Sequence, residues 1–183
     1  MLSFPKRYAD TVARLRVPTG FLLVAAFAWF SKPTVLSLIW GLPVSVLGLM
    51  LRGWSAGCLA KNQVLATGGP YAYTRNPLYI GTLLVAAGLV IGARNTGLGA
   101  LFAAVFVFIY LPVITLEEQH LSQLFQGYAQ YAARVPVLFP RLRPAVTNNS
   151  NPFRWSLYLK NQEYQAGAGF GAGMLFLLWK ALR

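Results

Sequence analysis

Five apolar runs, separated by short polar or Gly/Pro-rich breaks, divide the chain: 17–30, 34–51, 77–93, 98–116 and 164–182. Apolar stretches of roughly 17–25 residues are the length that an α-helix needs to cross a bilayer. The first run is shorter but follows a basic, amphipathic stretch. The pattern therefore predicts an all-α integral membrane protein with about five transmembrane helices, joined by loops and by a further helix on the cytoplasmic side.

The breaks predict where these helices turn. Residues 31–33 are too few for anything but a hairpin turn, so the second helix should return antiparallel to the first. We expect the second helix to continue past Arg52 as far as Lys61, until Gly68-Gly69-Pro70 ends it. Pro77 suits the first turn of a helix, because its missing N–H has no partner there. Pro112 lies inside the fourth run and should free the carbonyl of Phe108 and kink that helix.

The amino-terminal 30 residues imitate a secretory signal peptide. Basic residues precede an apolar stretch, and Ala26-Phe27-Ala28 resembles a cleavage site but lies inside the apolar run. We therefore expect 17–30 to be an uncleaved first span. We expect 1–16 to be a basic amphipathic helix on an anionic leaflet, with its cationic residues at Lys6, Arg7, Arg14 and Arg16.

The chain after the fourth run predicts a cytoplasmic helix at 121–134. Tyr128, Tyr131 and Arg134 recur there every three residues, so they could address one ligand together. Prolines and asparagines at 136–152 indicate loop structure. We predict a membrane core at 1–147, followed at 148–183 by a linker, a polar segment and a fifth helix. Four glycines in that helix favour close packing or self-association of the chain: Gly167, Gly169, Gly171 and Gly173.

Composition excludes a soluble globule. Of 183 residues, 56% are hydrophobic and only 11% are charged, and the mean hydropathy is +0.51. The net charge of +12 does not indicate nucleic-acid binding, because the basic residues fall between apolar runs rather than along one stripe. With Cys58 and His120 as the sole cysteine and histidine, neither an internal disulfide nor a Cys/His metal site is expected.

The basic residues are divided unequally between the two sides of the predicted helices. Twelve lie on the side of the amino terminus, and four, Lys32, Arg94, Lys180 and Arg183, lie on the other. Because Lys and Arg accumulate on the cytoplasmic side, we predict a cytoplasmic amino terminus and an external carboxyl terminus. The membrane would be a bacterial-type inner membrane or its equivalent.

One polar block opens the third run: Gly68-Gly-Pro-Tyr-Ala-Tyr-Thr-Arg-Asn-Pro-Leu-Tyr-Ile-Gly81. Arg75 and Asn76 stand at the start of a helix, where unpaired N–H groups and a basic side chain suit a carboxylate. The alternative is an interfacial anchor, with Arg75 reaching lipid headgroups and nearby tyrosines forming an aromatic belt, namely Tyr71, Tyr73 and Tyr79.

A second polar block follows the fourth run. Glu117-Glu118 is followed by Leu121, Phe125, Gly127, Tyr128, Tyr131, Arg134-Val135-Pro136 and Pro140. Together, Gly-Pro-Tyr, Arg-Asn-Pro-x-Tyr-x-Gly and this block resemble the isoprenylcysteine carboxyl methyltransferase and phospholipid methyltransferase superfamily of membrane enzymes. The glycine of the second block is shifted by one place. The resemblance covers residues 52–140 with both blocks in the family's order.

The resemblance implies an S-adenosylmethionine-dependent methyltransferase with its active site in the cytoplasm. It assigns catalytic roles to Arg75, Glu118 and Arg134. It places in the cofactor pocket Tyr71, Arg75, Asn76, Pro77, Tyr79, Gly81, Glu117, Glu118, Tyr128 and Tyr131. Many relatives have histidine where this chain has Asn76; asparagine keeps a donor and an acceptor but does not titrate. The sulfonium donor is already activated, so the protein chiefly aligns a nucleophile with the methyl group and excludes water.

The acceptor stays open at this stage. An isoprenylcysteine-like carboxylate, a phospholipid amine and a lipophilic thiol all suit a site entered from the bilayer. Gly81 could let a lipid tail approach the helix backbone, or it could simply pack against a neighbouring helix. Two other functions are an NADPH-dependent sterol-type reductase, whose longer signature with arginine and aspartate is missing, and a non-catalytic lipid-binding protein.

Overall fold

The computed structural model describes residues 6–145 and 151–183, and these residues form helices and loops without a strand. The helices are α1 (Lys6–Phe30), α2 (Val35–Cys58), η1 (Gly69–Ala72), α3 (Pro77–Ala93), α4 (Thr96–Val105), η2 (Phe106–Tyr110), α5 (Leu111–Leu124), α6 (Tyr128–Arg134), α7 (Trp155–Lys160) and α8 (Tyr164–Ala181). The predicted all-α class is confirmed.

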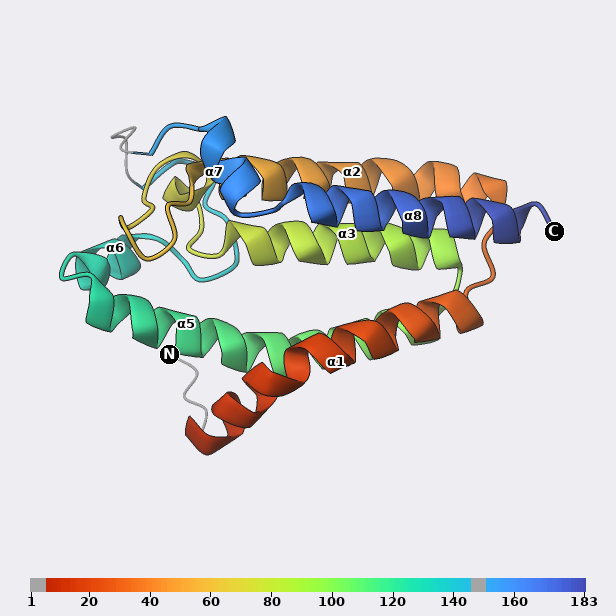
Figure 1. Cartoon of the computed structure of the whole chain (residues 1–183), viewed down its shortest axis with the longest axis horizontal. Coiled ribbons are helices and arrows are strands. Elements are labelled where there is room, and N and C mark those ends of the chain that lie inside the picture. Colours follow the sequence, from red (N-terminus) through yellow and green to blue (C-terminus); the bar gives the residue numbers. More distant parts are fainter. Residues whose placement is uncertain (1–5, 146–150) are drawn as a thin grey trace.

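The long helices lie lengthwise beside one another, with tight turns at one end and the short helices and long loops at the other (Figure 1). At the turn end, the Lys32 N–H donates to the Ala93 carbonyl at 2.8 Å. The Asn95 amide donates to the Phe30 carbonyl at 3.0 Å. Lys180 Nζ, near the carboxyl terminus, donates to the Ala28 carbonyl at 2.9 Å. The predicted reversal after residues 31–33 is therefore present, and α8 ends beside it.

Helices α2 and α3 pack closely because glycines face each other. A Cβ added at Gly48 would lie 2.6 Å from the Gly81 carbonyl oxygen, so no side chain fits there. Small residues let two backbones approach, and polar side chains then reach the facing carbonyls. The Ser45 hydroxyl donates to the Val85 carbonyl at 2.9 Å, and the Ser37 hydroxyl donates to the Gly92 carbonyl at 2.8 Å.

Residues 96–124 form one continuous helical run, with a π-helical turn at η2 between α4 and α5. Pro112 has no N–H for the Phe108 carbonyl, as the sequence predicts. That carbonyl instead accepts a hydrogen bond from the Tyr8 hydroxyl at 2.7 Å, which ties α1 to the irregular turn.

Two helical segments among the described residues are long and apolar enough to cross a membrane, Val35–Cys58 and Thr96–Leu124. Val17–Phe30 and Pro77–Ala93 are apolar but shorter. The number of five spans, the division at residue 147 and the sidedness of the termini stay predictions. In the described part of the chain, an added Cβ at Gly167, Gly169, Gly171 or Gly173 would meet no atom within 4 Å. Self-association through these glycines also stays a prediction.

Several predicted boundaries were wrong. Residues 6–30 are one helix rather than an amphipathic helix followed by a span. α2 ends at Cys58 rather than Lys61, since the Asn161 amide binds the Ala56 and Leu59 carbonyls, each at 2.9 Å. The predicted helix 121–134 is interrupted after Leu124, because Phe125 is extended. Residues 1–5 of the basic stretch and 146–150 of the linker lie outside the described residues.

Candidate active site

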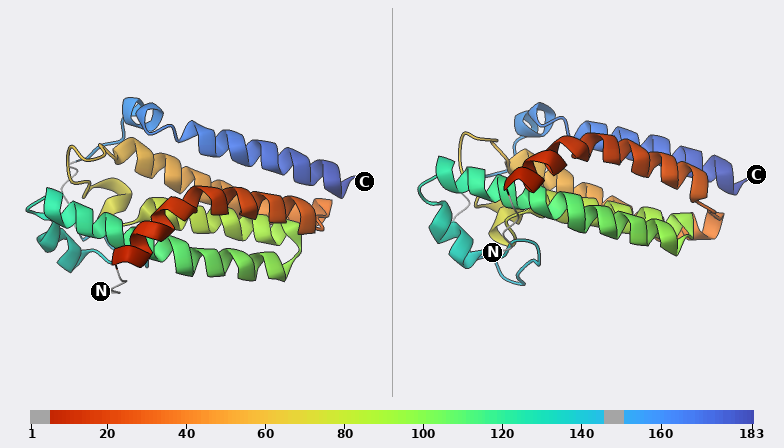
Figure 2. Two further views of the ribbon diagram at one scale, coloured as in Figure 1. Left: turned by 60° about the horizontal axis from the view of Figure 1, so that its bottom comes forward. Right: turned by 90° about the horizontal axis from the view of Figure 1, so that it is seen from below.

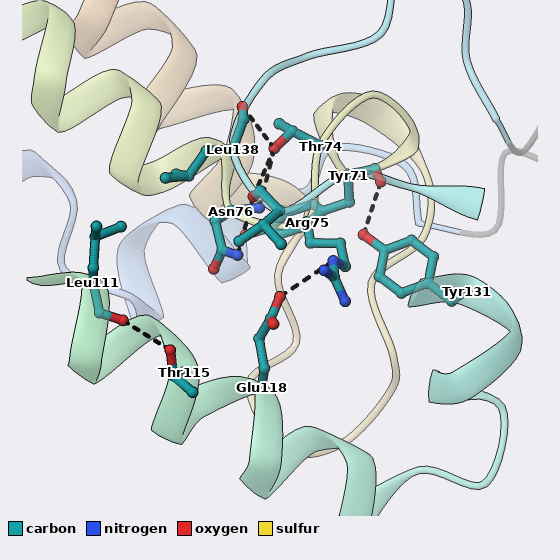
Figure 3. Close-up of polar contacts among 10 residues, drawn as sticks. Tyr71, Thr74, Arg75, Asn76, Leu111, Thr115, Glu118, Tyr131 and Leu138 are labelled. Atoms are coloured by element: carbon teal, nitrogen blue, oxygen red, sulfur yellow. Dashed lines mark hydrogen bonds and ion pairs between the residues drawn. The ribbon is translucent and has the colours of Figure 1, made fainter. Parts of the chain in front are cut away.

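The first polar block is fixed to the segment that follows α6. Gly69 has a φ of +56°, a conformation that favours glycine, and it starts the turn η1. The Arg75 N–H donates to the Pro136 carbonyl at 2.9 Å. Asn76 Nδ2 donates to the Val137 carbonyl at 3.2 Å, and the Thr74 hydroxyl lies within hydrogen-bond distance of the same segment (Figure 3). Two distant parts of the sequence therefore position the Arg75 side chain together.

Arg75 and Glu118 form a buried ion pair. Arg75 Nε lies 3.2 Å from Glu118 Oε1, and the two side chains are 8% and 10% exposed (Figure 3). Burial of Arg75 excludes the interfacial-anchor interpretation for this residue. Burying a charged pair is costly unless further hydrogen bonds satisfy both groups.

Those further bonds are missing among the described residues. Five buried side-chain atoms make no hydrogen bond there: Arg75 Nε, Arg75 Nη1, Glu118 Oε1, Tyr71 Oη and Tyr128 Oη. Arg75 Nε and Glu118 Oε1 face each other in the ion pair, but not with the geometry of a hydrogen bond. Buried polar atoms in folded proteins are nearly always paired, so an unpaired group of this kind suits a polar ligand.

The tyrosines of α6 lie against the same pair. Tyr128 and Tyr131 are buried, with their ring centroids 6.2 Å apart in an edge arrangement. Tyr131 donates its hydroxyl hydrogen to the Tyr71 carbonyl at 2.8 Å (Figure 3). Burial raises the pKa of Tyr128 to about 12. The pKa of Tyr131 is also raised, mainly by burial and to a smaller extent by the nearby Tyr128. Both hydroxyls therefore stay protonated near neutral pH and can act as donors.

The adjacent carboxylates of the second block have different surroundings. Glu118 is buried, whereas Glu117 is exposed and its Oε1 accepts a hydrogen bond from the Tyr79 hydroxyl at 3.0 Å. The Tyr79 ring in turn meets the edge of Tyr110 with 6.0 Å between centroids. His120 on the same helix is also exposed.

A cavity of about 880 Å³ connects these groups. Small-molecule sites typically have volumes of about 300–1,000 Å³. Nine of the predicted site residues line the cavity: Tyr71, Arg75, Asn76, Pro77, Tyr79, Glu117, Glu118, Tyr128 and Tyr131. The structure thus brings together residues that are separated by up to 60 positions in the sequence.

Two predicted site residues lie elsewhere. Arg134 is exposed, does not line the cavity, and its carbonyl accepts a bond from Arg141 Nη1 at 2.7 Å. A three-residue step falls about 60° short of a full helical turn, so Arg134 is rotated about 120° from Tyr128. Gly81 is buried against α2, where an added Cβ would lie 2.8 Å from the Gly48 carbonyl oxygen. The packing alternative for Gly81 is therefore the one that the structure shows.

Sequence reasoning missed a second polar cluster in the cavity wall. Arg52 Nε lies 2.6 Å from Glu163 Oε1, and Arg52 Nη2 donates to Glu163 Oε2 at 3.0 Å. Arg52 Nη1 donates to the Thr82 hydroxyl at 2.5 Å. The three residues line the cavity together with Asn161. One signal was present: Glu163 is one of only four acidic residues in the chain, so it was a candidate partner for an arginine inside an apolar helix.

The profile of the phospholipid methyltransferase family matches residues 20–127, which is more than half of the chain. The chain belongs to this family. The resemblance seen in the two polar blocks is confirmed, and the matched region contains Arg75 and Glu118. Tyr128, Tyr131 and Glu163 lie beyond it.

Three known proteins are similar to this chain over part of its length. The cobalt-zinc-cadmium resistance protein CzcN of Cupriavidus metallidurans is 37% identical over 107 residues, 55% of this chain and 50% of the relative. The nickel-cobalt-cadmium resistance protein NccN of Alcaligenes xylosoxydans xylosoxydans is 36% identical over 107 residues, with the same two shares. The protein-S-isoprenylcysteine O-methyltransferase of Schizosaccharomyces pombe is 30% identical over 146 residues, 76% of this chain and 61% of the relative.

The chain therefore spans about half the length of the two metal-resistance relatives. No solved structure matches it.

Proposed function

We propose that the protein is an integral membrane methyltransferase that uses S-adenosylmethionine and acts on a lipophilic acceptor. The observation that carries this proposal is the buried Arg75–Glu118 pair, whose unpaired polar atoms line a cavity of about 880 Å³. Membership of the phospholipid methyltransferase family supports the same conclusion.

The residues fit the polar groups of this donor. The Arg75 guanidinium could bind the donor's carboxylate with two parallel N–H bonds. Glu118 could accept hydrogen bonds from its amino group or ribose hydroxyls, and the Tyr128 hydroxyl could donate to it. Tyrosine rings in the wall can hold a positive sulfonium on their faces. When bound, S-adenosylmethionine supplies an activated methyl group, so these residues need only bind it, orient it and exclude water.

The acceptor should be apolar because the cavity extends between helices. Its wall includes Ala13 of α1 and Val113 and Leu116 of α5, apart from the polar groups near Arg75. The name of the Schizosaccharomyces pombe relative favours a carboxylate on a prenylated cysteine. The description of the family favours a phospholipid amine instead, and a lipophilic thiol stays a third candidate, because the names of the other two relatives refer to metal resistance and give no acceptor. The catalytic roles fall on Arg75 and Glu118, because Arg134 lies away from the cavity.

Titration calorimetry with S-adenosylhomocysteine in detergent tests the cofactor. We expect Arg75→Ala and Glu118→Ala each to weaken binding by about 1.5–3 kcal/mol, the scale of hydrogen bonds to charged groups. Arg143→Ala is the matched control, since this arginine is exposed on a neighbouring loop. Glu118→Gln, which keeps the side-chain volume, separates loss of charge from loss of packing.

Thermal melting distinguishes the alternatives, because a ligand that binds the native state raises the melting temperature. We expect S-adenosylhomocysteine to raise it and NADPH to leave it unchanged. Stabilisation by NADPH alone would replace the proposal with a reductase. Stabilisation by neither ligand would favour a non-catalytic lipid-binding protein.

A further inference from the structure

The segment 138–144, Leu-Phe-Pro-Arg-Leu-Arg-Pro, carries the two most exposed large apolar side chains of the described residues. Phe139 is 89% exposed and Leu142 is 101% exposed. Arg141 and Arg143 alternate with them and are also exposed. Exposed apolar side chains next to cationic ones are typical of a surface that binds a membrane or another protein.

Hydrogen bonds fix the backbone near Phe139 and Leu142. The Arg141 N–H donates to the Tyr73 carbonyl at 3.0 Å, and the Ala145 N–H donates to the Ala72 carbonyl at 2.9 Å. Arg141 Nη1 also donates to the Arg134 carbonyl at 2.7 Å. Hydrogen bonds to the rest of the protein therefore hold the segment in a conformation that exposes Phe139 and Leu142.

The segment lies beside the outer surface of the helices. A shallow hollow contains Pro140 together with Leu51 and Trp54 of α2 and Ile80 of α3. Trp54 is 46% exposed, and tryptophan is enriched where a bilayer meets water. Figure 2 shows the segment after α6, drawn in cyan, projecting from the side of the bundle. Leu51 and Trp54 lie near the end of α2, which is long and apolar enough to cross a membrane, so a bilayer that α2 crosses would end close to this hollow.

We propose that residues 138–144 form a lipid-binding anchor on the cytoplasmic surface of the bilayer. Phe139 and Leu142 enter the boundary between headgroups and acyl chains, and Arg141 and Arg143 bind phosphates of anionic lipids. Anionic leaflets attract such basic residues, and arginine can keep its charge in the headgroups while its stem lies along apolar surface. A protein partner fits less well, because a stable protein interface buries about 1,200–2,000 Å², more than two exposed apolar side chains can supply.

The anchor has a consequence for the cavity. The Arg141 N–H binds the Tyr73 carbonyl, and the residues that flank the segment continue this contact, since Ala145 binds the Ala72 carbonyl and the Pro136 carbonyl accepts from the Arg75 N–H. Contact with lipid therefore holds the first polar block at a fixed height relative to the membrane surface. This holds whatever molecule the cavity binds, so the anchor can be tested independently of methyl transfer.

Depth-dependent fluorescence quenching of the full-length protein in vesicles tests the anchor. Cys58→Ala removes the single, buried cysteine, and Leu142→Cys then carries an environment-sensitive dye. Leu142 is fully exposed, so this change removes no internal contact. The matched control is Gln130→Cys on α6, also exposed. Vesicles contain phosphatidylcholine with or without phosphatidylglycerol, and the quenchers are a spin-labelled lipid and aqueous iodide.

We expect lipid quenching at position 142 and iodide quenching at position 130. Adding phosphatidylglycerol should strengthen the first signal. Arg141→Gln and Arg143→Gln should each reduce the ratio of lipid-quenched to iodide-quenched dye at 142 by about fivefold in these anionic vesicles. Iodide quenching at 142 equal to that at 130 would overturn the proposal. Protection of 142 from both quenchers would also overturn it, since a protein surface would then cover the segment.

Discussion

Tyr128 and Tyr131 lie one turn apart on α6, but within the part of the chain that the structure describes their hydroxyls differ in hydrogen bonding. The Tyr131 hydroxyl binds the Tyr71 carbonyl, whereas the Tyr128 hydroxyl is buried without a partner among the described residues. Removing a made hydrogen bond costs stability, but removing an unpaired buried hydroxyl does not. The two residues therefore separate a structural from a ligand-binding role.

We expect Tyr131→Phe to lower the free energy of unfolding by about 1 kcal/mol, because the Tyr71 carbonyl loses its partner. Tyr128→Phe should leave the stability of the ligand-free protein unchanged or slightly raise it, and should weaken S-adenosylhomocysteine binding. Chemical denaturation and calorimetry in the same detergent measure both effects. Equal loss of stability in the two variants would contradict the assignment of the Tyr128 hydroxyl to a ligand.

Some residues of the site could be predicted from the sequence, and others could not. The resemblance of the two polar blocks to a known family identified Arg75, Glu118 and the tyrosines that line the cavity, whereas spacing alone left Arg75 open to the interfacial-anchor interpretation. The three-residue spacing did not predict that Arg134 lies outside the cavity, since two such steps along α6 rotate it by about 120° from Tyr128. Spacing also could not pair Arg52 with Glu163, which lie 111 positions apart.

At the scale of elements, this Arg52–Glu163 pair connects α2 to the start of α8. The contact is bidentate, and the two side chains are only 24% and 10% exposed. Charged residues inside or near a membrane are costly unless they are paired. The pair therefore positions α8 and the preceding segment, whose Asn161 also closes the end of α2.

We expect Arg52→Gln or Glu163→Gln to lower the free energy of unfolding by about 3 kcal/mol, because each leaves one charge buried without its partner. The exchange of both residues, Arg52→Glu with Glu163→Arg, should recover most of this loss. Lys160→Gln serves as the control, since Lys160 is exposed on α7. If the exchanged protein were no more stable than the single variants, the ion pair would not be what holds α8.

Helix boundaries were predictable where local residues set them. α3 runs from Pro77 to Ala93, as expected, because Pro77 suits its first turn and Arg94 adopts a left-handed conformation after its end. The end of α2 was not predictable, because the side chain that binds its last carbonyls comes from Asn161. The glycine contact between α2 and α3 also needed the structure, since glycines elsewhere in the chain face open space.

On the scale of the whole molecule, the two ends of the bundle differ in structure. One end contains the tight turns and the last turn of α8, and the other contains the cavity, α6 and the proposed lipid anchor (Figure 1). The basic residues predicted for the cytoplasmic side include Arg52, Arg75, Arg141 and Arg143, all at the cavity end. The charge pattern and the helix arrangement therefore both favour an orientation in which the cavity end faces the cytoplasm.

Reporter fusions test this orientation. We expect fusions at Ser31 and Asn95 to report the external side, because both residues lie at the turn end, where the Asn95 amide binds the Phe30 carbonyl. A fusion at Asn149 should report the cytoplasm. Asn149 lies outside the described residues, but the Ala145 N–H binds the Ala72 carbonyl and the Asn151 side chain accepts from the Thr67 N–H, both at the cavity end.

A fusion after Arg183 completes the test, because it reports whether α8 crosses the membrane. Lys180 binds the Ala28 and Trp29 carbonyls beside the first turn, so we expect the external side. A cytoplasmic signal after Arg183, with Asn149 also cytoplasmic, would mean that α8 does not span and that the chain has four spans. An external signal at Asn149 would place the cavity on the side where cytosolic S-adenosylmethionine is absent, and would overturn both the orientation and the proposed cofactor.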